Sequence, residues 1–224
     1  MARTRAADYE AKRTHLLRTA ASLFARHGYD RTSLAMIAVA AGVSKGLVYH
    51  YYSDKNAVLA DIIRRHLAEL IETQTAAAAK DGRSPERRLA DMATALLAAY
   101  RDADAEHQVQ VAHLSLLPEP VQRELKDMER VLVSLFADAL AAVAPPLAGD
   151  RRLLKPLTMS LFGMLNWAFL WYREDGAMTR AEYAELAAHL VVLGARDAAG
   201  LPVTGGEGAS VVAALAPVGA QTAS

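Results

Sequence analysis

Apolar residues recur every three or four positions along almost the whole sequence, and this spacing constrains the fold more than any other feature. Near the start, Leu16, Leu17, Ala20, Leu23 and Phe24 share one face of a helix. No stretch alternates apolar and polar residues as a half-buried strand does. The sequence therefore predicts an all-α fold, in which several amphipathic helices bury a common core.

Caps and helix breakers divide this pattern into segments, because glycine and proline end helices and short polar side chains begin them. We expect helices over about residues 9–27, 33–40, 44–51, 54–75, 84–104, 105–116, 118–143, 155–172 and 179–196. Either Thr32 or Ser33 is the expected cap of the second helix, and Ser53 is the expected cap of the long fourth helix. Pro156 is expected in the first turn of the most apolar helix, and Thr179 with Glu182 forms a capping box for the last one.

The charge is neutral overall but unevenly distributed. Residues 1–55 carry nine basic and four acidic side chains, a net charge of +5, and the remainder carries −5. A basic head on an acidic body suggests that only the head meets a polyanion. The chain has no cysteine, which excludes disulfides, zinc–thiolate sites and a cysteine nucleophile.

The chain carries no recognisable targeting or membrane segment. Its first 30 residues are charged and lack the apolar core of a signal peptide. The longest uncharged apolar run, residues 159–172, is too short to cross a membrane. We therefore expect a cytoplasmic protein that does not contact membranes.

Residues 32–55 carry the strongest functional signal. A short helix, a turn at Gly42 and a second helix capped by Ser44 form the unit that places a helix in the major groove of DNA. Gly42 permits the backbone of the turn, and Gly46 lacks a side chain where the backbone must approach the duplex. Lys45 can reach a base edge or a phosphate. Residue types that bind phosphate follow at Tyr49, His50 and Lys55.

Residues 13–59 resemble, without gaps, the DNA-binding domain of the TetR/AcrR family of bacterial regulators. The matching residues include Gly28-Tyr29, Ile37-Ala38, the run from Ala41 to Gly46, and Tyr49 to Tyr52. The resemblance implies that Thr32, Tyr49, His50 and Lys55 hold phosphates, and that Lys45, Gly46 and Leu47 lie at base edges. The residues expected at the double-stranded operator DNA are Arg31, Thr32, Ser33, Ser44, Lys45, Gly46, Leu47, Tyr49, His50 and Lys55.

The same resemblance implies a division of the chain. Residues 1–55 would be the DNA-binding domain, and residues 56–197 a ligand-binding and dimerisation domain in which 56–75 is the connecting helix. The last two helices would form a four-helix interface in a homodimer. Residues 198–224 are rich in Gly, Ala, Ser, Thr and Pro, and we expect them to be a disordered tail.

A second resemblance concerns the effector. The run from Phe162 to Ala168, then Trp171 to Arg173, with a further stretch around Arg123, resembles TetR regulators of fatty acid, phenylacetate and steroid breakdown. It implies a repressor released by a coenzyme A thioester such as phenylacetyl-CoA or a fatty acyl-CoA. Such an effector needs an apolar tunnel and polar contacts at the mouth of that tunnel. Met164 is a further candidate for the lining of the tunnel. The predicted ligand-binding residues are His107, His113, Arg123, Phe162, Asn166, Trp167, Phe169, Trp171 and Arg173.

Other interpretations stay open at this point. An aromatic stripe at helical spacing is also typical of a plain core, as we expect for Tyr52, and Asn166 suits a subunit interface equally well. The effector is alternatively a hydrophobic drug-like compound that controls an efflux operon, or there is no effector. The sequence has no catalytic, metal-binding or cofactor-binding motif, so we expect no enzyme, no metal and no cofactor.

Overall fold

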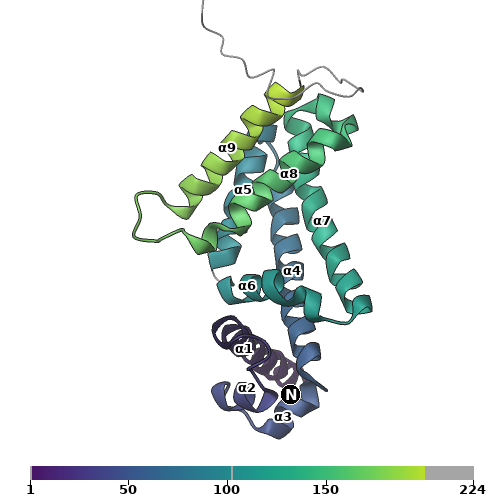
Figure 1. Cartoon of the computed structure of the whole chain (residues 1–224), viewed down its shortest axis with the longest axis vertical. Coiled ribbons are helices and arrows are strands. Elements are labelled where there is room, and N and C mark those ends of the chain that lie inside the picture. Colours follow the sequence, from purple (N-terminus) through teal and green to yellow (C-terminus); the bar gives the residue numbers. More distant parts are fainter. Residues whose placement is uncertain (1, 102, 200–224) are drawn as a thin grey trace, which may run out of the picture.

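The structure, a computed structural model, describes residues 2–101 and 103–199, and all regular secondary structure within these ranges is helical. The all-α prediction is confirmed. Figure 1 labels the α-helices. Three short 3-10 turns, η1 to η3, lie in the connections that follow α6, α7 and α8. Their bounds are α1 Ala2–His27, α2 Leu34–Ala40, α3 Lys45–Tyr51, α4 Lys55–Ala78, α5 Pro85–Arg101, α6 Asp104–His113, η1 Leu114–Leu116, α7 Glu119–Val143, η2 Pro145–Gly149, α8 Arg151–Asn166, η3 Ala168–Leu170 and α9 Arg180–Ala199.

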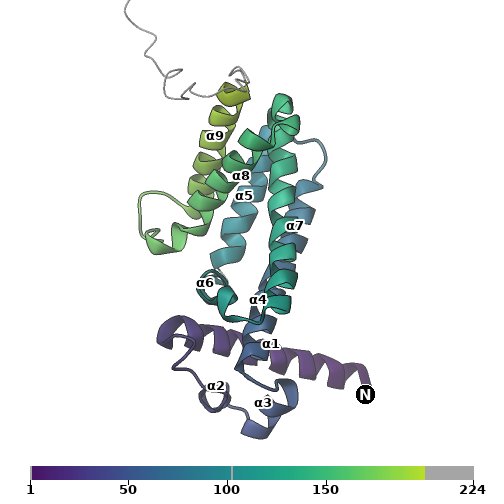
Figure 2. The same cartoon turned by 45° about the vertical axis from the view of Figure 1, so that its right-hand side comes forward.

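Helices α1 to α3 form a small head, and α5, α7, α8 and α9 form a larger body (Figures 1 and 2). The long helix α4 runs from the head into the body, and α6 lies across the joint between them. Two buried clusters follow this division. The core of the head takes in α4 as far as Leu67, whereas the core of the body begins on α4 at Leu70. One rigid helix is therefore packed into both parts.

The caps of the head helices form as the sequence predicts, with one exception. The Ser33 and Ser44 hydroxyls accept hydrogen bonds from the backbone N–H of Met36 and Leu47, at 3.2 and 3.1 Å. Gly42 has a φ of +65° in the turn between them, a conformation that favours glycine. The prediction that Ser53 caps α4 is wrong, because the Asp54 carboxylate accepts from the Ala57 N–H at 2.8 Å.

Helix α8 differs from its prediction at both ends. It begins at Arg151 because the Asp150 carboxylate accepts from the Arg152 N–H, so Pro156 lies inside the helix and not in its first turn. It ends at Asn166 because side chains occupy its last carbonyl groups. The Tyr183 hydroxyl donates to the Met164 carbonyl at 2.9 Å. The chain continues as η3, and the predicted single helix 155–172 is wrong.

Other helix ends shift less. Helix α5 ends at Arg101 and not at residue 104, while the capping box of α9 is confirmed, since Thr179 and Glu182 exchange hydrogen bonds. Helix α9 extends to Ala199, so the predicted tail begins two residues too early. The rest of that tail, residues 200–224, lies outside the described residues.

One stretch in the described part of the chain is long and apolar enough to cross a membrane by length and mean hydropathy alone. It is Arg152–Leu170, which spans α8 and η3. The sequence analysis did not identify this stretch because it considered only apolar runs without a charged residue. In the fold one face of this stretch packs into the body through Leu161, Phe162 and Leu165. Its other face is the apolar surface described below.

Candidate DNA-binding and effector sites

An open groove of about 570 Å³ runs over the head between the start of α2 and the exposed face of α3. Its walls include Ser33 and Ala35 from one helix and Lys45 and Tyr49 from the other. Tyr49 is half exposed, and the Lys45 ammonium lies 5.6 Å from the centre of its ring. A cation and a phenol are thus held side by side on one exposed face, an arrangement suited to a phosphate backbone.

Five of the ten residues predicted to contact DNA line this groove, namely Thr32, Ser33, Lys45, Tyr49 and Lys55. The predicted residues that are exposed at the surface are Arg31, Ser33, Ser44, Lys45, Gly46, Tyr49 and His50, and Leu47 is partly exposed. A Cβ atom on Gly46 would lie 3.9 Å from the Ser44 hydroxyl and meet nothing else within 4 Å, so the surface there is open. Ser33 and Ser44 use their hydroxyls as helix caps, and they therefore orient the helices.

Thr32 and Lys55 also make contacts inside the head. Thr32 is 1% exposed, and its hydroxyl donates to the Gly28 carbonyl at 2.9 Å. The Lys55 ammonium donates to the Tyr29 carbonyl at 2.6 Å and to the Asp30 carbonyl at 3.4 Å, and it lies 4.1 Å from the Tyr29 ring. Both side chains therefore help to position the helices of the head. Lys55 is partly exposed and keeps a third N–H donor, and the phosphate contacts of both residues stay predictions.

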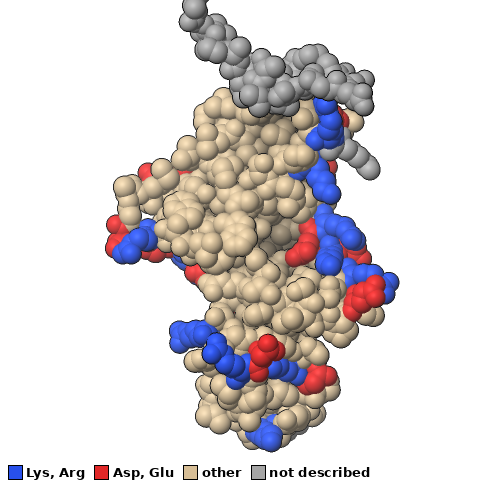
Figure 3. Space-filling model, viewed as in Figure 1, with Lys and Arg blue, Asp and Glu red and all other residues tan. Residues whose placement is uncertain are grey.

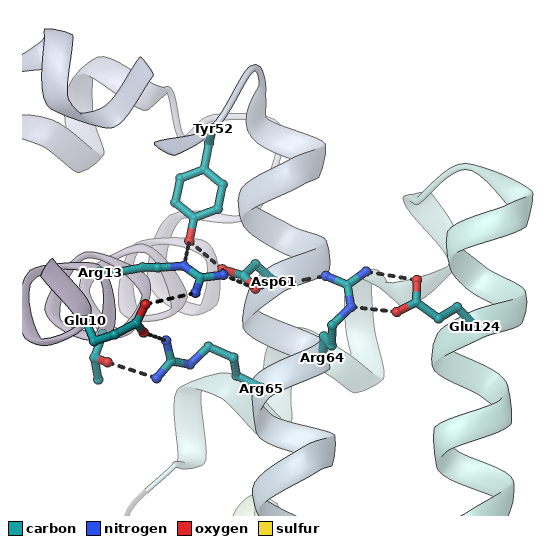
Figure 4. A network of polar contacts seen from close by, with 8 residues as sticks. Glu10, Arg13, Tyr52, Asp61, Arg64, Arg65 and Glu124 are labelled. Carbon is teal, nitrogen blue, oxygen red and sulfur yellow. Dashed lines mark hydrogen bonds and ion pairs between the residues drawn. The ribbon is translucent and has the colours of Figure 1, made fainter. Parts of the chain in front are cut away.

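A buried polar network beneath α3 was missed by the sequence reading (Figure 4). Tyr52, the residue after α3, is buried as expected, and its hydroxyl donates to Asp61 at 2.5 Å. Arg13 of α1 donates from Nη2 to both oxygens of Asp61, at 3.0 and 2.8 Å. Burial, followed by the hydrogen bond to Asp61, raises the pKa of Tyr52, so the phenol keeps its proton. Asp61 therefore ties α1, α4 and the end of α3 together.

The network continues from the head into the body. Arg64, one turn after Asp61, donates from Nε and Nη2 to the two carboxylate oxygens of Glu124 on α7, at 2.6 and 2.9 Å. These hydrogen bonds lower the pKa of Glu124 and keep it ionised. On the other side, Arg65 donates to the Thr14 hydroxyl at 2.9 Å and lies 3.5 Å from Glu10 (Figure 4). These charged residues are far apart in the sequence, so the sequence alone did not indicate that they pair.

The body contains a small polar chamber that brings together three of the predicted ligand-binding residues. Tyr100 donates to the Asn166 side-chain oxygen at 2.8 Å, and His107 Nε2 donates to the Asn166 backbone carbonyl at 3.1 Å. Phe169 packs edge-on against the His107 ring, at 5.8 Å between centroids. The chamber holds about 10 Å³, roughly the room for one water molecule.

The remaining predicted ligand residues lie apart from this chamber. Phe162 is buried against Phe136, and His113 packs against Tyr29 of the head. Trp167 and Trp171 are half exposed. Arg123 and Arg173 lie at the surface beside Glu119 and Asp175. Of the predicted aromatic residues, only Phe169 lines the chamber in the part of the chain that the structure describes.

Arg180 at the start of α9 borders the chamber and was not predicted. Its Nε donates to Glu174 at 2.6 Å, its Nη2 lies 3.8 Å from Asp104, and its guanidinium lies 4.9 Å from the Tyr172 ring. It thus fastens the segment between η3 and α9 onto α6. No group of three or more potential metal ligands occurs in the ranges that the structure describes.

His66 of α4 lies behind the chamber, 5.9 Å from the His107 ring, and both rings are buried. Burial and the neighbouring His107 lower the pKa of His66 to about 3. The unfolded chain binds a proton near pH 6.5, so it takes up protons that the folded protein excludes. Stability contributed by neutral His66 is therefore present above pH 6.5 and is lost as the pH falls toward 3.

We expect the free energy of unfolding to drop by about 2 kcal/mol between pH 7 and pH 5 through His66 alone. Urea unfolding across this range measures the drop. His66→Leu should flatten the pH dependence by that amount, whereas His15→Leu, at an exposed position, should not. An unchanged slope in His66→Leu would show that His66 accepts a proton in the folded protein.

The outer face of α8 and α9 is apolar. Figure 3 shows a broad surface over α8 and the adjoining part of α9 with almost no charged side chains. Gly163 lies on this face, and a Cβ atom there would meet nothing within 4 Å. Large hydrophobic side chains at least 40% exposed on these helices and the turn after α8 are Met159, Trp167, Leu170, Trp171, Leu186, Leu190 and Leu193. A surface of this kind is typical of a protein interface.

Comparisons with known proteins agree with this architecture. Residues 16–62 match the family model "Bacterial regulatory proteins, tetR family", and residues 82–195 match "Tetracyclin repressor-like, C-terminal domain". The crystal structure of a TetR-family transcriptional regulator from Bordetella parapertussis superposes with a TM-score of 0.75. It is 34% identical, and the match covers 80% of this chain and 93% of that one.

Three further relatives are more distant or partial. The HTH-type transcriptional repressor KstR2 of Rhodococcus jostii is 33% identical over 105 residues, which is 46% of this chain and 52% of the relative. The match to the regulator AcrR of Shigella flexneri covers 29% of that protein, so the chain spans about half or less of the length of these curated relatives. The structure of AibR with isovaleryl coenzyme A and operator DNA shares the fold at 20% identity, with a TM-score of 0.69 over 80% of this chain and 97% of that one.

Proposed function

The chain belongs to the TetR family of bacterial transcriptional regulators, and from this premise we propose that it is a dimeric repressor that a coenzyme A thioester releases from its operator. The observation that carries the DNA-binding part is the exposed face of α3. Lys45 and Tyr49, one helical turn apart, project there, and Leu47 is partly exposed on the same helix. The start of this helix is fixed by the Ser44 cap and its end by Tyr52. A helix held at both ends can enter a major groove in one orientation.

The apolar face of α8 and α9 supports the dimer. Glycine within a helix costs about 1 kcal/mol relative to alanine. No atom of the described residues lies within 4 Å of a Cβ atom placed on Gly163. A close approach by the helices of a second copy accounts for the glycine and would cover the exposed leucines and tryptophans. Two copies related by a two-fold axis would then read two half-sites.

Selection from a library of random duplexes tests the DNA-binding proposal. The protein should enrich a partly palindromic sequence, and its affinity for that sequence should fall steeply with salt because basic side chains neutralise phosphates. Absence of any enriched sequence at moderate salt would overturn the proposal. The enriched duplex, called the selected operator below, then serves in the other experiments.

Tyr49→Ala should weaken binding to the selected operator and to unrelated duplexes about equally, by roughly 5–10-fold. The phenol is assigned to a phosphate, which positions the protein without distinguishing bases. Fluorescence anisotropy with both duplexes measures the change, and the melting temperature should stay within a few degrees because Tyr49 is half exposed. Tyr49→Phe isolates the hydroxyl. A loss confined to the selected operator would assign Tyr49 to base recognition.

The thioester proposal rests on the residues around α8 and on the polar chamber. His107 donates from Nε2 to a carbonyl, so its Nδ1 is an acceptor, buried and without a partner in the described part of the chain. Asn166 and Arg180 add polar groups to the same wall. The fold is shared with AibR, whose structure holds isovaleryl coenzyme A. Because the chamber is small, an acyl or aryl group would enter only when η3 and its Phe169 move outward.

Titration with phenylacetyl-CoA, octanoyl-CoA and free coenzyme A tests this part. The only two tryptophans of the chain, Trp167 and Trp171, flank η3 and should report binding by fluorescence. A bound thioester should weaken operator affinity by roughly 5–150-fold. Phe169→Ala should change the affinity for the thioester and leave operator affinity unchanged. If neither thioester binds below about millimolar concentration, the thioester proposal fails and the DNA-binding proposal stands.

A further inference from the structure

We propose that Glu124 on α7 controls how firmly Asp61 holds the recognition helix α3, because it keeps Arg64 away from Asp61. The inference rests on the proposed binding of DNA by α3. It assigns a positioning role to two residues, Arg64 and Glu124, that lie in the joint between head and body and outside the DNA-binding surface.

The first step is the anchoring of α3. Asp61 is 6% exposed, and its Oδ2 accepts from both the Tyr52 hydroxyl and Arg13 Nη2. Its Oδ1 accepts a second hydrogen bond from Arg13, at 3.0 Å. Tyr52 directly follows the last residue of α3. The position of the recognition helix therefore depends on Asp61 remaining bound to Tyr52 and Arg13.

The second step is the position of Arg64 between two carboxylates. Its Nη1 lies 4.0 Å from Asp61 Oδ1, too far for a hydrogen bond, while Nε and Nη2 hold Glu124 in a bidentate pair. In Figure 4 the guanidinium of Arg64 lies between Asp61 on one side and Glu124 on the other. Glu124 is thus the group that draws Arg64 toward α7.

The third step follows from charge. If Glu124 loses its charge or moves away with α7, the nearest carboxylate for Arg64 is that of Asp61. Arg64 would then bind the same oxygen, Oδ1, that Arg13 already occupies, and two guanidinium groups at one oxygen repel each other. The side chains of Arg64 and Glu124 are both partly exposed, so breaking their ion pair costs little free energy. The Asp61 contacts are buried, so their weakening matters more. A small shift of α7 would therefore loosen α3.

A double-mutant comparison of two substitutions, each of which replaces a charged side chain with an uncharged glutamine, tests this sequence of steps. In the otherwise intact protein, Glu124→Gln should weaken affinity for the selected operator by roughly 3–10-fold, since Arg64 is released toward Asp61. In an Arg64→Gln background the same substitution should change affinity by less than about twofold, because no cation remains to be released. Asp127→Asn is the matched control, since this exposed carboxylate on α7 pairs only within its own helix with Arg130.

Amide hydrogen exchange gives a second readout that needs no DNA. Exchange in residues 45–53 should be faster in Glu124→Gln than in the unaltered protein, and this acceleration should vanish in the double variant. An equal loss of affinity in both backgrounds, or no loss in either, overturns the inference. If the unaltered protein binds no duplex, the proposed function fails, and the exchange experiment still decides whether Glu124 acts on α3 through Arg64.

Discussion

Asp61→Ala should lower the free energy of unfolding by about 3 kcal/mol and remove most binding to the selected operator. The substitution takes away the only carboxylate that accepts from both Arg13 and Tyr52 in the described structure, and leaves a guanidinium and a phenol facing each other beneath α3. Asp61 and Tyr52 are buried, whereas the Arg13 side chain is 31% exposed and keeps Glu10 at 3.6 Å, so we expect the low end of the cost of breaking a buried ion pair. Because Tyr52 also loses its anchor, α3 should lose its fixed orientation.

Urea unfolding and anisotropy on the same preparation separate these two effects. Tyr52→Phe removes the hydroxyl that donates to Asp61 and accepts from Arg13 Nε at 3.3 Å, and it leaves the ion pair, so it should cost about 1–2 kcal/mol. Asp127→Ala, at an exposed carboxylate of α7, should stay within about 0.5 kcal/mol of the unaltered protein. If Asp61→Ala unfolds like the unaltered protein, the buried network has no part in holding the head together.

Leu190→Arg should convert the dimer into a monomer and weaken binding to the selected operator by about 100-fold or more. Leu190 lies on α9 and is 51% exposed in the single chain, so arginine is tolerated when the chain is alone. In the proposed dimer the same position is covered, and two guanidinium groups would be buried near the two-fold axis without partners. A monomer engages one half-site at a time and loses the gain from joint binding.

Sedimentation velocity at micromolar concentration measures the change in mass. Val111→Arg is the matched control, since Val111 of α6 is similarly exposed but lies outside the apolar face of α8 and α9. It should leave both the mass and the operator affinity unchanged. A dimer that persists in Leu190→Arg would place the interface on another surface.

The head was largely predictable from the sequence because its signals are local. Ser33, Ser44 and Gly42 act on residues within one turn, and each has the cap or backbone angle that its residue type favours. The C-terminal end of α8 was not predictable, since the carbonyl groups of Met164 and Asn166 are bound by side chains from α9 and α6. Those partners are distant in sequence, and helical spacing carries no information about them.

The same limit applies to the candidate sites. Lys45 and Tyr49 were assigned correctly to the exposed face of α3 by their register, although their contact with DNA stays a prediction. Thr32 and Lys55 have the residue types of phosphate contacts, yet their polar groups bind carbonyls made available by the end of α1 and the loop after it. The pairs Arg13–Asp61 and Arg64–Glu124 join residues 48 and 60 positions apart, and only the fold brings them together.

The central claim is that α3 reads base edges in two symmetric half-sites, and a comparison of selected sequences tests it most directly. Random duplexes would be selected in parallel with the unaltered protein and with Leu47→Ala, a change at a partly exposed position of α3. We expect two inverted half-sites whose centres lie about 10 base pairs apart or a multiple of that. Leu47→Ala should alter the preferred base at symmetric positions in both half-sites and keep their spacing. An identical base preference in both selections, or a single half-site without symmetry, would contradict the account.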